Sequence, residues 1–143
     1  MNPLSLSYSE LESTVMGATP AGLIVLSYDM AIGCLEQACE SIEKGDIEAR
    51  CMAMTKASDL VTELYMSLDH EQGGEIANNL GSLYGFILSR LPRISFYNDV
   101  HTARHIIGIL KNLRDSWSEV DLTLTAQAAS MATADTAGMG VGA

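Results

Sequence analysis

The chain has 143 residues, of which 48% are hydrophobic, and carries a formal net charge of -10 at pH 7. This length is typical of a single domain with one hydrophobic core. The acidic charge argues against binding to nucleic acids or to anionic membranes, because both would require a basic surface.

The N-terminal third gives no indication of a membrane-spanning or secretory segment. Its longest apolar stretch, LIVLSYDMAIGCL, is interrupted by Ser27 and Asp29, well short of the roughly 20 apolar residues that span a bilayer. The opening MNPLSLSYSELE lacks the basic region and apolar core of a secretory signal. We therefore expect a cytoplasmic protein without membrane insertion.

The first predicted helix begins at Thr19 and Pro20, an N-cap residue followed by a proline suited to the first helical position. It ends at Lys44 and Gly45, a cation followed by a C-cap glycine. Between these caps, apolar residues recur at helical spacing and form a core-facing stripe: Ile24, Tyr28, Ala31, Leu35, Ala38 and Ile42.

The second helix has Asp46 as its predicted N-cap and should end near Asp69, before a DHEQGG loop. The third helix follows with an apolar stripe made of Ile76, Leu80, Leu83, Ile87 and Leu91. Pro92 lacks a backbone N–H and would cost about 3 kcal/mol inside a helix. The third helix is therefore expected to end or kink at Pro92.

The fourth helix is capped by Asn98 or Asp99 and has a seam of Ile106, Leu110, Leu113 and Trp117. No stretch alternates with the period of a strand, and the short links between helices favour antiparallel neighbours. The sequence predicts an all-α fold, an antiparallel up-and-down four-helix bundle over residues 19–120.

Two segments flank this bundle. Within residues 1–18, Tyr8, Leu11 and Val15 form an apolar stripe too short to be a stable helix alone, so we expect a helical cap that docks on the bundle. Residues 121–143 have mostly small side chains that bury too little surface to offset the entropy of ordering them. We predict a flexible tail there.

Three cysteines, Cys34, Cys39 and Cys51, lie within helical patterns and lack the paired spacing of a zinc site. Free cysteine packs as a small hydrophobic residue, so we expect buried, reduced thiols. The carboxylates of ELE, EKGDIE and DHEQGGE fall in caps, loops and exposed faces, where charge ordinarily serves solubility. We expect no enzyme activity and no cofactor.

Histidines offer two further hypotheses. His101 and His105 lie four positions apart and could contact a metal from one helical face, but no third ligand is evident, so no metal site is expected. A histidine phosphotransfer domain is also a four-helix bundle, and it remains the alternative. Neither histidine, nor His70, is followed by the leucine, lysine and glycine that usually flank the phosphorylated residue of that class.

The apolar excess is the most informative feature. The first and third helices carry apolar residues on two faces, whereas one stripe per helix is enough for a four-helix core. Two interpretations are open: a tightly packed bundle with wide stripes, or a groove for an apolar peptide lined partly by adaptable methionines.

Five segments, in this order and at these spacings, resemble the flagellin-export chaperone family FliS: ATPAGLIVLSYDMAI, SIEKGD, KASDLVTELYMSLD, GGEIANNLGSLYGFILSRL and NDVHTARHIIGILKNLRDSW. The resemblance runs from Tyr8 to Trp117. It implies a bundle that binds the disordered C-terminal segment of flagellin, prevents premature polymerisation in the cytoplasm and presents flagellin to the flagellar type III export gate. A homodimer in the absence of this client is left open.

The resemblance also implies that the N-terminal segment can occupy part of the client surface, with Tyr8 at the corresponding position. The sequence departs from the family pattern at Pro92, in the RISFYND stretch and at Met30, where glycine is common.

The candidate client-binding residues form three groups. Tyr8, Leu11 and Val15 are predicted to form a displaceable cap. Asn78 and Asn79 either supply amide partners for the backbone of the client or serve as capping or solvent-facing residues. The groove candidates, several of which must belong to the core, are Leu23, Ile24, Tyr28, Ile32, Leu80, Leu83, Tyr84 and Ile87.

Overall fold

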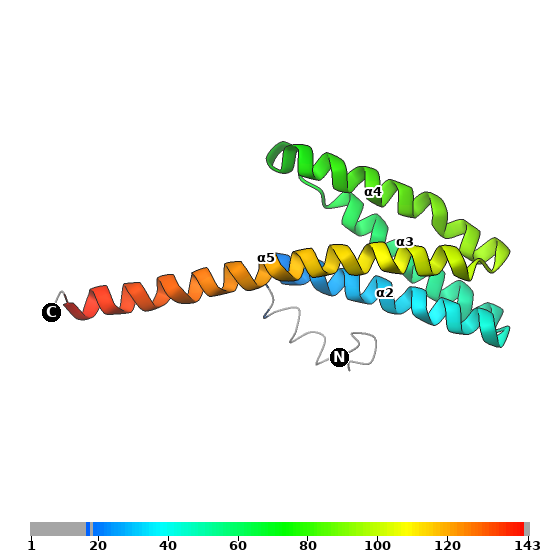
Figure 1. Cartoon of the computed structure of the whole chain (residues 1–143), viewed down its shortest axis with the longest axis horizontal. Coiled ribbons are helices and arrows are strands. Elements are labelled where there is room, and N and C mark those ends of the chain that lie inside the picture. The colour runs from blue at the N-terminus through cyan, green and yellow to red at the C-terminus, as the bar shows by residue number, and fades with distance from the viewer. Residues whose placement is uncertain (1–16, 18, 142–143) are drawn as a thin grey trace.

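The computed structural model describes the backbone of residues 17 and 19–141 and most side chains up to Ser130. Within this range it has four α-helices and no strand (Figure 1). The helices are α2 (Pro20–Lys44), α3 (Ile47–Met66), α4 (His70–Tyr97) and α5 (Val100–Val141). The predicted all-α four-helix bundle is confirmed.

Helix α2 has the predicted caps. The Thr19 side chain accepts a hydrogen bond from the backbone N–H of Gly22, and Pro20 occupies the first turn. Gly45 ends the helix in the left-handed conformation with φ 71°, which glycine adopts without steric cost. Asp46 then caps α3 by accepting from the N–H of Ala49. These boundaries were predictable because capping depends on a few adjacent residues.

The connection between α3 and α4 differs from the prediction. Asp69 is the N-cap of α4 and accepts hydrogen bonds from two backbone N–H groups, so most of the predicted DHEQGG loop is the first turn of a helix. Gly74 interrupts α4 with φ 51° and ψ -124°, a conformation that a side chain would strain. A Cβ on Gly73 would lie 2.8 Å from that of Ala77, so this close approach also requires glycine.

Helix α4 does not end at Pro92, so the first of the two expected outcomes there, an end or a kink, was wrong. The helix continues to Tyr97, and its non-helical dihedral angles are at Gly74. Pro92 itself is exposed, while Leu91 and Ile94 on either side are buried in the core and hold this turn in place. Tertiary packing thus outweighs the local cost of the missing N–H.

The two candidate caps of the fourth helix have separate roles. Asn98 ends α4 in the left-handed conformation, with φ 52°. Asp99 caps α5, because one carboxylate oxygen accepts from the N–H of Thr102 and the other from its hydroxyl.

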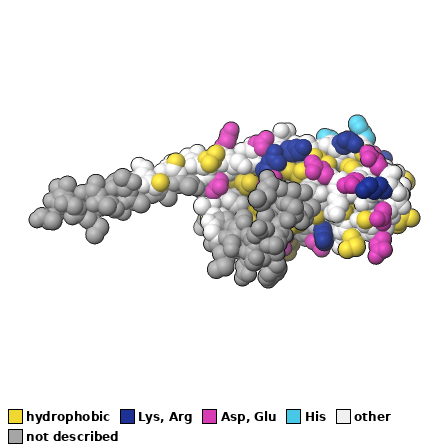
Figure 2. Space-filling view, turned by 90° about the horizontal axis from the view of Figure 1, so that it is seen from below, with side chains coloured by type: hydrophobic (Ala, Val, Ile, Leu, Met, Phe, Trp, Pro, Cys, Tyr) yellow, Lys and Arg dark blue, Asp and Glu magenta, His cyan; other side chains and the backbone are white. Residues whose placement is uncertain are grey.

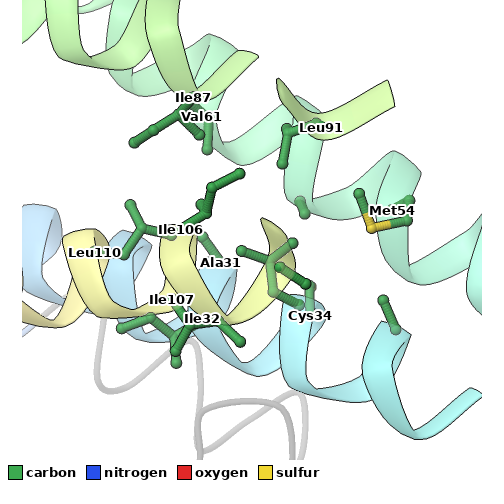
Figure 3. Close-up of a cluster of buried hydrophobic side chains, with 14 of the residues drawn as sticks. Ala31, Ile32, Cys34, Met54, Val61, Ile87, Leu91, Ile106, Ile107 and Leu110 are labelled. Carbon is green, nitrogen blue, oxygen red and sulfur yellow. The ribbon is translucent and has the colours of Figure 1, made fainter. Parts of the chain in front are cut away.

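The core lies where α2 packs along both α3 and α5, with α4 covering α3 and, less extensively, α5. Side chains from all four helices point toward one another there (Figure 3). Those without exposed surface include Leu35, Val61, Ile87, Ile94, Ile106 and Leu110. Cys34 and Cys39 are buried as predicted, and burial raises the pKa of each thiol. Cys51 is exposed, so the prediction for it was wrong, because it lines an open hollow between α3 and α4 instead of the core.

One helix of the described chain, α2, is long and apolar enough to cross a membrane by length and composition alone. No such segment was expected from the sequence. In the structure 44% of its most apolar window is buried. A core helix of a bundle meets the same length and hydropathy criteria, so α2 is weak support for a membrane span.

Helix α5 leaves the bundle at its C-terminal end (Figure 1). It has 42 residues, which gives a length of about 63 Å. The helix continues across residues 121–141, where the sequence predicted a flexible tail. Alanine is the strongest helix former, and five alanines lie between positions 126 and 134. The hydroxyl of Thr19 donates to Asp121, which ties α5 to the start of α2 at this point.

Candidate functional site

A cleft opens at the end of the bundle where α3 turns into α4. It has a volume of about 220 Å³, and all four helices contribute to its walls. We call it the Trp117 cleft and define it by its lining residues: Ile24, Leu64, Ser67, Leu68, Asp69, Gly73, Ile76, Ala77, Leu80, Tyr84 and Trp117. Most of these side chains are apolar. The volume is enough for a branched aliphatic or aromatic side chain, since a cavity of about 150 Å³ holds benzene.

The break at Gly74 shapes one wall of this cleft. The turn before the break contributes Asp69 and Gly73, and the helix after it contributes Ile76. His70 Nδ1 lies 3.1 Å from the side-chain oxygen of Asn78, a hydrogen bond that joins the two parts across the break. Without this change of direction the first turn of α4 would continue along the helix axis instead of folding toward the cleft.

A tyrosine pair lies beside the cleft. The hydroxyls of Tyr28 on α2 and Tyr84 on α4 form a buried hydrogen bond, and their ring centroids are 6.4 Å apart. Burial raises the pKa of both hydroxyls, and at Tyr28 the hydrogen bond to Tyr84 raises it further. Both hydroxyls therefore stay neutral and have partners. The wall formed by Tyr84 offers an entering side chain mainly apolar contact.

The structure separates the predicted groove residues by burial. Ile24 and Leu80 line the Trp117 cleft and are partly buried, as is Leu83 outside it. Leu23 is exposed, at 37%. The remaining candidates are buried in the core, although Tyr84 also lines the cleft: Tyr28, Ile32, Tyr84 and Ile87.

Asn78 and Asn79 are both exposed on α4 after the break. Asn78 bonds His70, so in this structure it serves the local geometry of α4. The predicted cap residues Tyr8, Leu11 and Val15 lie outside the described residues.

Sequence reasoning missed part of the cleft. Leu64 from α3, Leu68 from the connection between α3 and α4, and Ala77 from α4 were not among the candidates, while Ile76 and Trp117 were assigned only to helix stripes. The usable signal was the Gly73–Gly74 pair, because adjacent glycines near a helix start indicate an unusual backbone path.

Two shallower hollows continue along α3. One, of about 480 Å³, is lined by Asp59, Thr62, Glu63, Met66 and Ser67, and it shares Ser67 with the Trp117 cleft. The other, of about 370 Å³, lies between α3 and α4 and shares Asp59 with the first; its apolar lining residues include Met54, Leu88, Leu91, Pro92 and Phe96. The three hollows thus follow one another along the length of α3.

The histidines have ordinary surroundings. His101 and His105 are exposed, and the ring of His105 meets Phe86 edge-on at 6.4 Å between centroids. Among the described residues, no group of three or more His, Cys, Asp or Glu side chains is placed to hold a metal ion.

These features define a class of protein: a helical bundle in which the Trp117 cleft and the hollow between α3 and α4 have the size and apolar lining that suit a segment of another chain. Residues 5–124 match the family described as flagellar protein FliS. The chain belongs to the FliS family, and the resemblance inferred from the sequence is confirmed.

Curated relatives agree with this assignment. The chain is 36% identical over 111 residues to the flagellar secretion chaperone FliS of Salmonella typhimurium, which covers 77% of this chain and 82% of that protein. It is 28% identical over 117 residues to FliS of Campylobacter jejuni, covering 81% and 91%. It is 29% identical over 110 residues to FliSB of Pseudomonas aeruginosa, covering 77% and 87%.

Proposed function

We propose that this chain is a cytoplasmic export chaperone that binds the disordered C-terminal segment of flagellin. In this proposal it keeps flagellin from polymerising prematurely and aids its delivery to the flagellar type III export apparatus. The observation that carries the proposal is the Trp117 cleft, an apolar site open at the surface of a bundle of the FliS family. The family assignment favours this function over histidine phosphotransfer.

The energetics favour a client with several anchors. Burying one leucine or phenylalanine side chain contributes about 1.5–3 kcal/mol, whereas ordering a disordered segment costs about 2–5 kcal/mol or more. One side chain in the Trp117 cleft would barely offset that cost. The hollow between α3 and α4, together with exposed Met66 and Ile76, provides additional apolar contacts for an extended or helical client.

Isothermal titration calorimetry with a peptide from the C-terminal segment of the cognate flagellin tests this proposal. We expect saturable binding with a negative heat-capacity change, because apolar surface is buried. Leu80→Ala should weaken binding by about 1–2 kcal/mol, since Leu80 lines the cleft. Leu122→Ala is the matched control, because Leu122 is 70% exposed on α5 and does not line the cleft. Absence of saturable binding to the unmodified chain would contradict the proposal.

The N-terminal cap has a role in the same proposal. Residues 1–18 would cover part of the client surface of the bundle, residues 19–120, until flagellin displaces Tyr8, Leu11 and Val15. Deleting residues 1–16 should then speed association in stopped-flow measurements, because the site no longer has to be vacated. An unchanged or slower association rate would instead indicate that the segment is a structural part of the bundle.

A further inference from the structure

On the parts of α3 and α4 near the Trp117 cleft, the side chains of Asp, Glu, Lys or Arg type are all carboxylates, so the charge there is negative. Residues 57–89, which form the second half of α3 and most of α4, contain five carboxylates and neither lysine nor arginine. Asp69 lines the cleft itself, and Asp59 and Glu63 line the adjoining hollow. Glu71 and Glu75 are exposed on α4, close in sequence to the lining residues Gly73 and Ile76.

We call the carboxylates Asp59, Glu63, Asp69, Glu71 and Glu75 the acidic rim of the cleft. Within its described part, α5 places no unpaired lysine or arginine beside this rim. Arg114, one turn before Trp117, lies 3.1 Å from a carboxylate oxygen of Asp29 and 3.1 Å from one of Asp115. After Arg114, α5 carries only acidic charges, including Glu119 and Asp121. Figure 2 shows acidic and no basic side chains along the described part of α5 that leaves the bundle.

The opposite end of the bundle is different. Lys44, Arg50, Arg93 and Arg104 lie near the connections between α2 and α3 and between α4 and α5. The net charge of -10 is therefore unevenly distributed, and the acidic excess gathers at the end that contains the cleft. Low-dielectric walls lined by one sign of charge concentrate the field in a cleft, which attracts the opposite charge.

The interior and the rim of the cleft therefore favour different parts of a ligand. The hydroxyls of Tyr28 and Tyr84 already bond each other and are not available to a ligand, so the mostly apolar interior of the cleft favours an apolar side chain. The carboxylates of the rim attract a positively charged side chain. Lysine and arginine suit such a boundary, because their aliphatic stems pack on apolar walls while their charged ends stay in water.

We propose that the segment that enters the Trp117 cleft has an apolar anchor flanked by lysine or arginine, and that these cations pair with the acidic rim. This inference rests on the proposed function and specifies the chemistry of the client at one site. It assigns Glu63, Glu71 and Glu75 a part in choosing the client, beyond the solubility that surface charge ordinarily provides.

The test compares two triple variants that each remove three negative charges. The rim variant is E63Q/E71Q/E75Q, and the control is E40Q/E43Q/E48Q at the opposite end, where the three carboxylates are also exposed. Glu71 and Glu48 both lie in the first turn of a helix, so their effects on the helix dipole are matched. The probe is a fluorescent peptide from the C-terminal segment of the cognate flagellin, and its Kd is measured at low and high salt.

At low salt we expect the rim variant to bind about tenfold more weakly than the unmodified chain, and the control to bind equally well. The difference should disappear at high salt, which screens exposed charges. A peptide whose lysines and arginines are replaced by glutamine should bind the unmodified chain more weakly, and the rim variant should not weaken it further. If a variant folds poorly, two measurements on the unmodified chain still decide the question: its affinity for the original peptide should fall as salt is added, and it should bind the glutamine-substituted peptide more weakly.

Three outcomes would overturn the inference. If the peptide binds the unmodified chain and the rim variant equally well at low and high salt, the charge pairing is contradicted but the proposed chaperone function stands. Equal weakening of both variants assigns the effect to net charge instead of the rim. Failure of the peptide to bind the unmodified chain under any salt condition overturns the proposed function and this inference together.

Discussion

Helices α2 and α4 are similar in length but are used differently. Ten of the 25 residues of α2 are buried, and this helix packs along both α3 and α5. Only five of the 28 residues of α4 are buried, although its stripe of apolar residues is equally regular. Both the Trp117 cleft and the hollow between α3 and α4 are lined partly by α4. An amphipathic helix can therefore leave part of its apolar surface open for a partner.

The largest expected difference between the two helices is the cost of shortening a leucine. Leu35→Ala in α2 should lower the free energy of unfolding by about 2–5 kcal/mol, because Leu35 is fully buried and its removal leaves a cavity. Leu80→Ala in α4 should cost about 1 kcal/mol, because this side chain is only partly buried beside an existing cleft. Urea denaturation measures both, and equal losses would place Leu80 in the core.

The hydrogen bond between Tyr28 and Tyr84 connects the two helices directly. Tyr28→Phe should destabilise the chain by about 1–3 kcal/mol, since the hydroxyl of Tyr84 loses a buried partner. The double variant Tyr28→Phe/Tyr84→Phe should cost less than the sum of the single variants. A double-mutant cycle from urea denaturation checks this coupling, and strict additivity would contradict it.

The break in α4 can be tested with two glycines of the same helix. Gly74→Ala should destabilise the chain by about 1–2 kcal/mol, because φ is positive at this position. Gly85→Ala should instead stabilise it by up to about 1 kcal/mol, since an added Cβ there meets nothing within 4 Å and alanine favours the helix. Thermal unfolding followed by circular dichroism compares the two, and a neutral Gly74→Ala would show that the break is not required.

The same contrast explains how much could be predicted from the sequence. Caps such as Thr19, Gly45 and Asp46 were located correctly because their geometry involves only neighbouring residues. The sequence could not separate Leu80 from Ile87, because both lie on one stripe of α4 and their burial depends on distant helices. Pro92 was misread for the same reason.

The residues of the Trp117 cleft come from four helices, and their convergence depends on how those helices pack. Periodicity reports which side of a helix is apolar. It does not report whether another helix covers that side, so it could identify Ile24, Leu80 and Tyr84 as apolar candidates but could not place them at one cleft.

The smallest expected effect concerns the far end of α4, where Asp99 caps α5. Hydrogen bonds from Thr102, followed by the charge of Arg93, lower the pKa of Asp99 below its usual value. A carboxyl group whose pKa is lower in the folded state contributes stability above its unfolded pKa of about 4, and this contribution is lost as the pH falls through the folded value. Asp99→Asn keeps an N-cap oxygen but removes the titration.

Urea midpoints measured between neutral and acidic pH should therefore fall less steeply for Asp99→Asn than for the unmodified chain. Asp59→Asn serves as the control, since Asp59 is an exposed residue inside α3 and caps no helix. It should leave the acid dependence nearly unchanged. If Asp99→Asn had the same acid dependence as the unmodified chain, the link between α4 and α5 would be independent of the Asp99 charge, and the attachment of α4 would rest on its apolar contacts and on the hydrogen bond between Tyr28 and Tyr84.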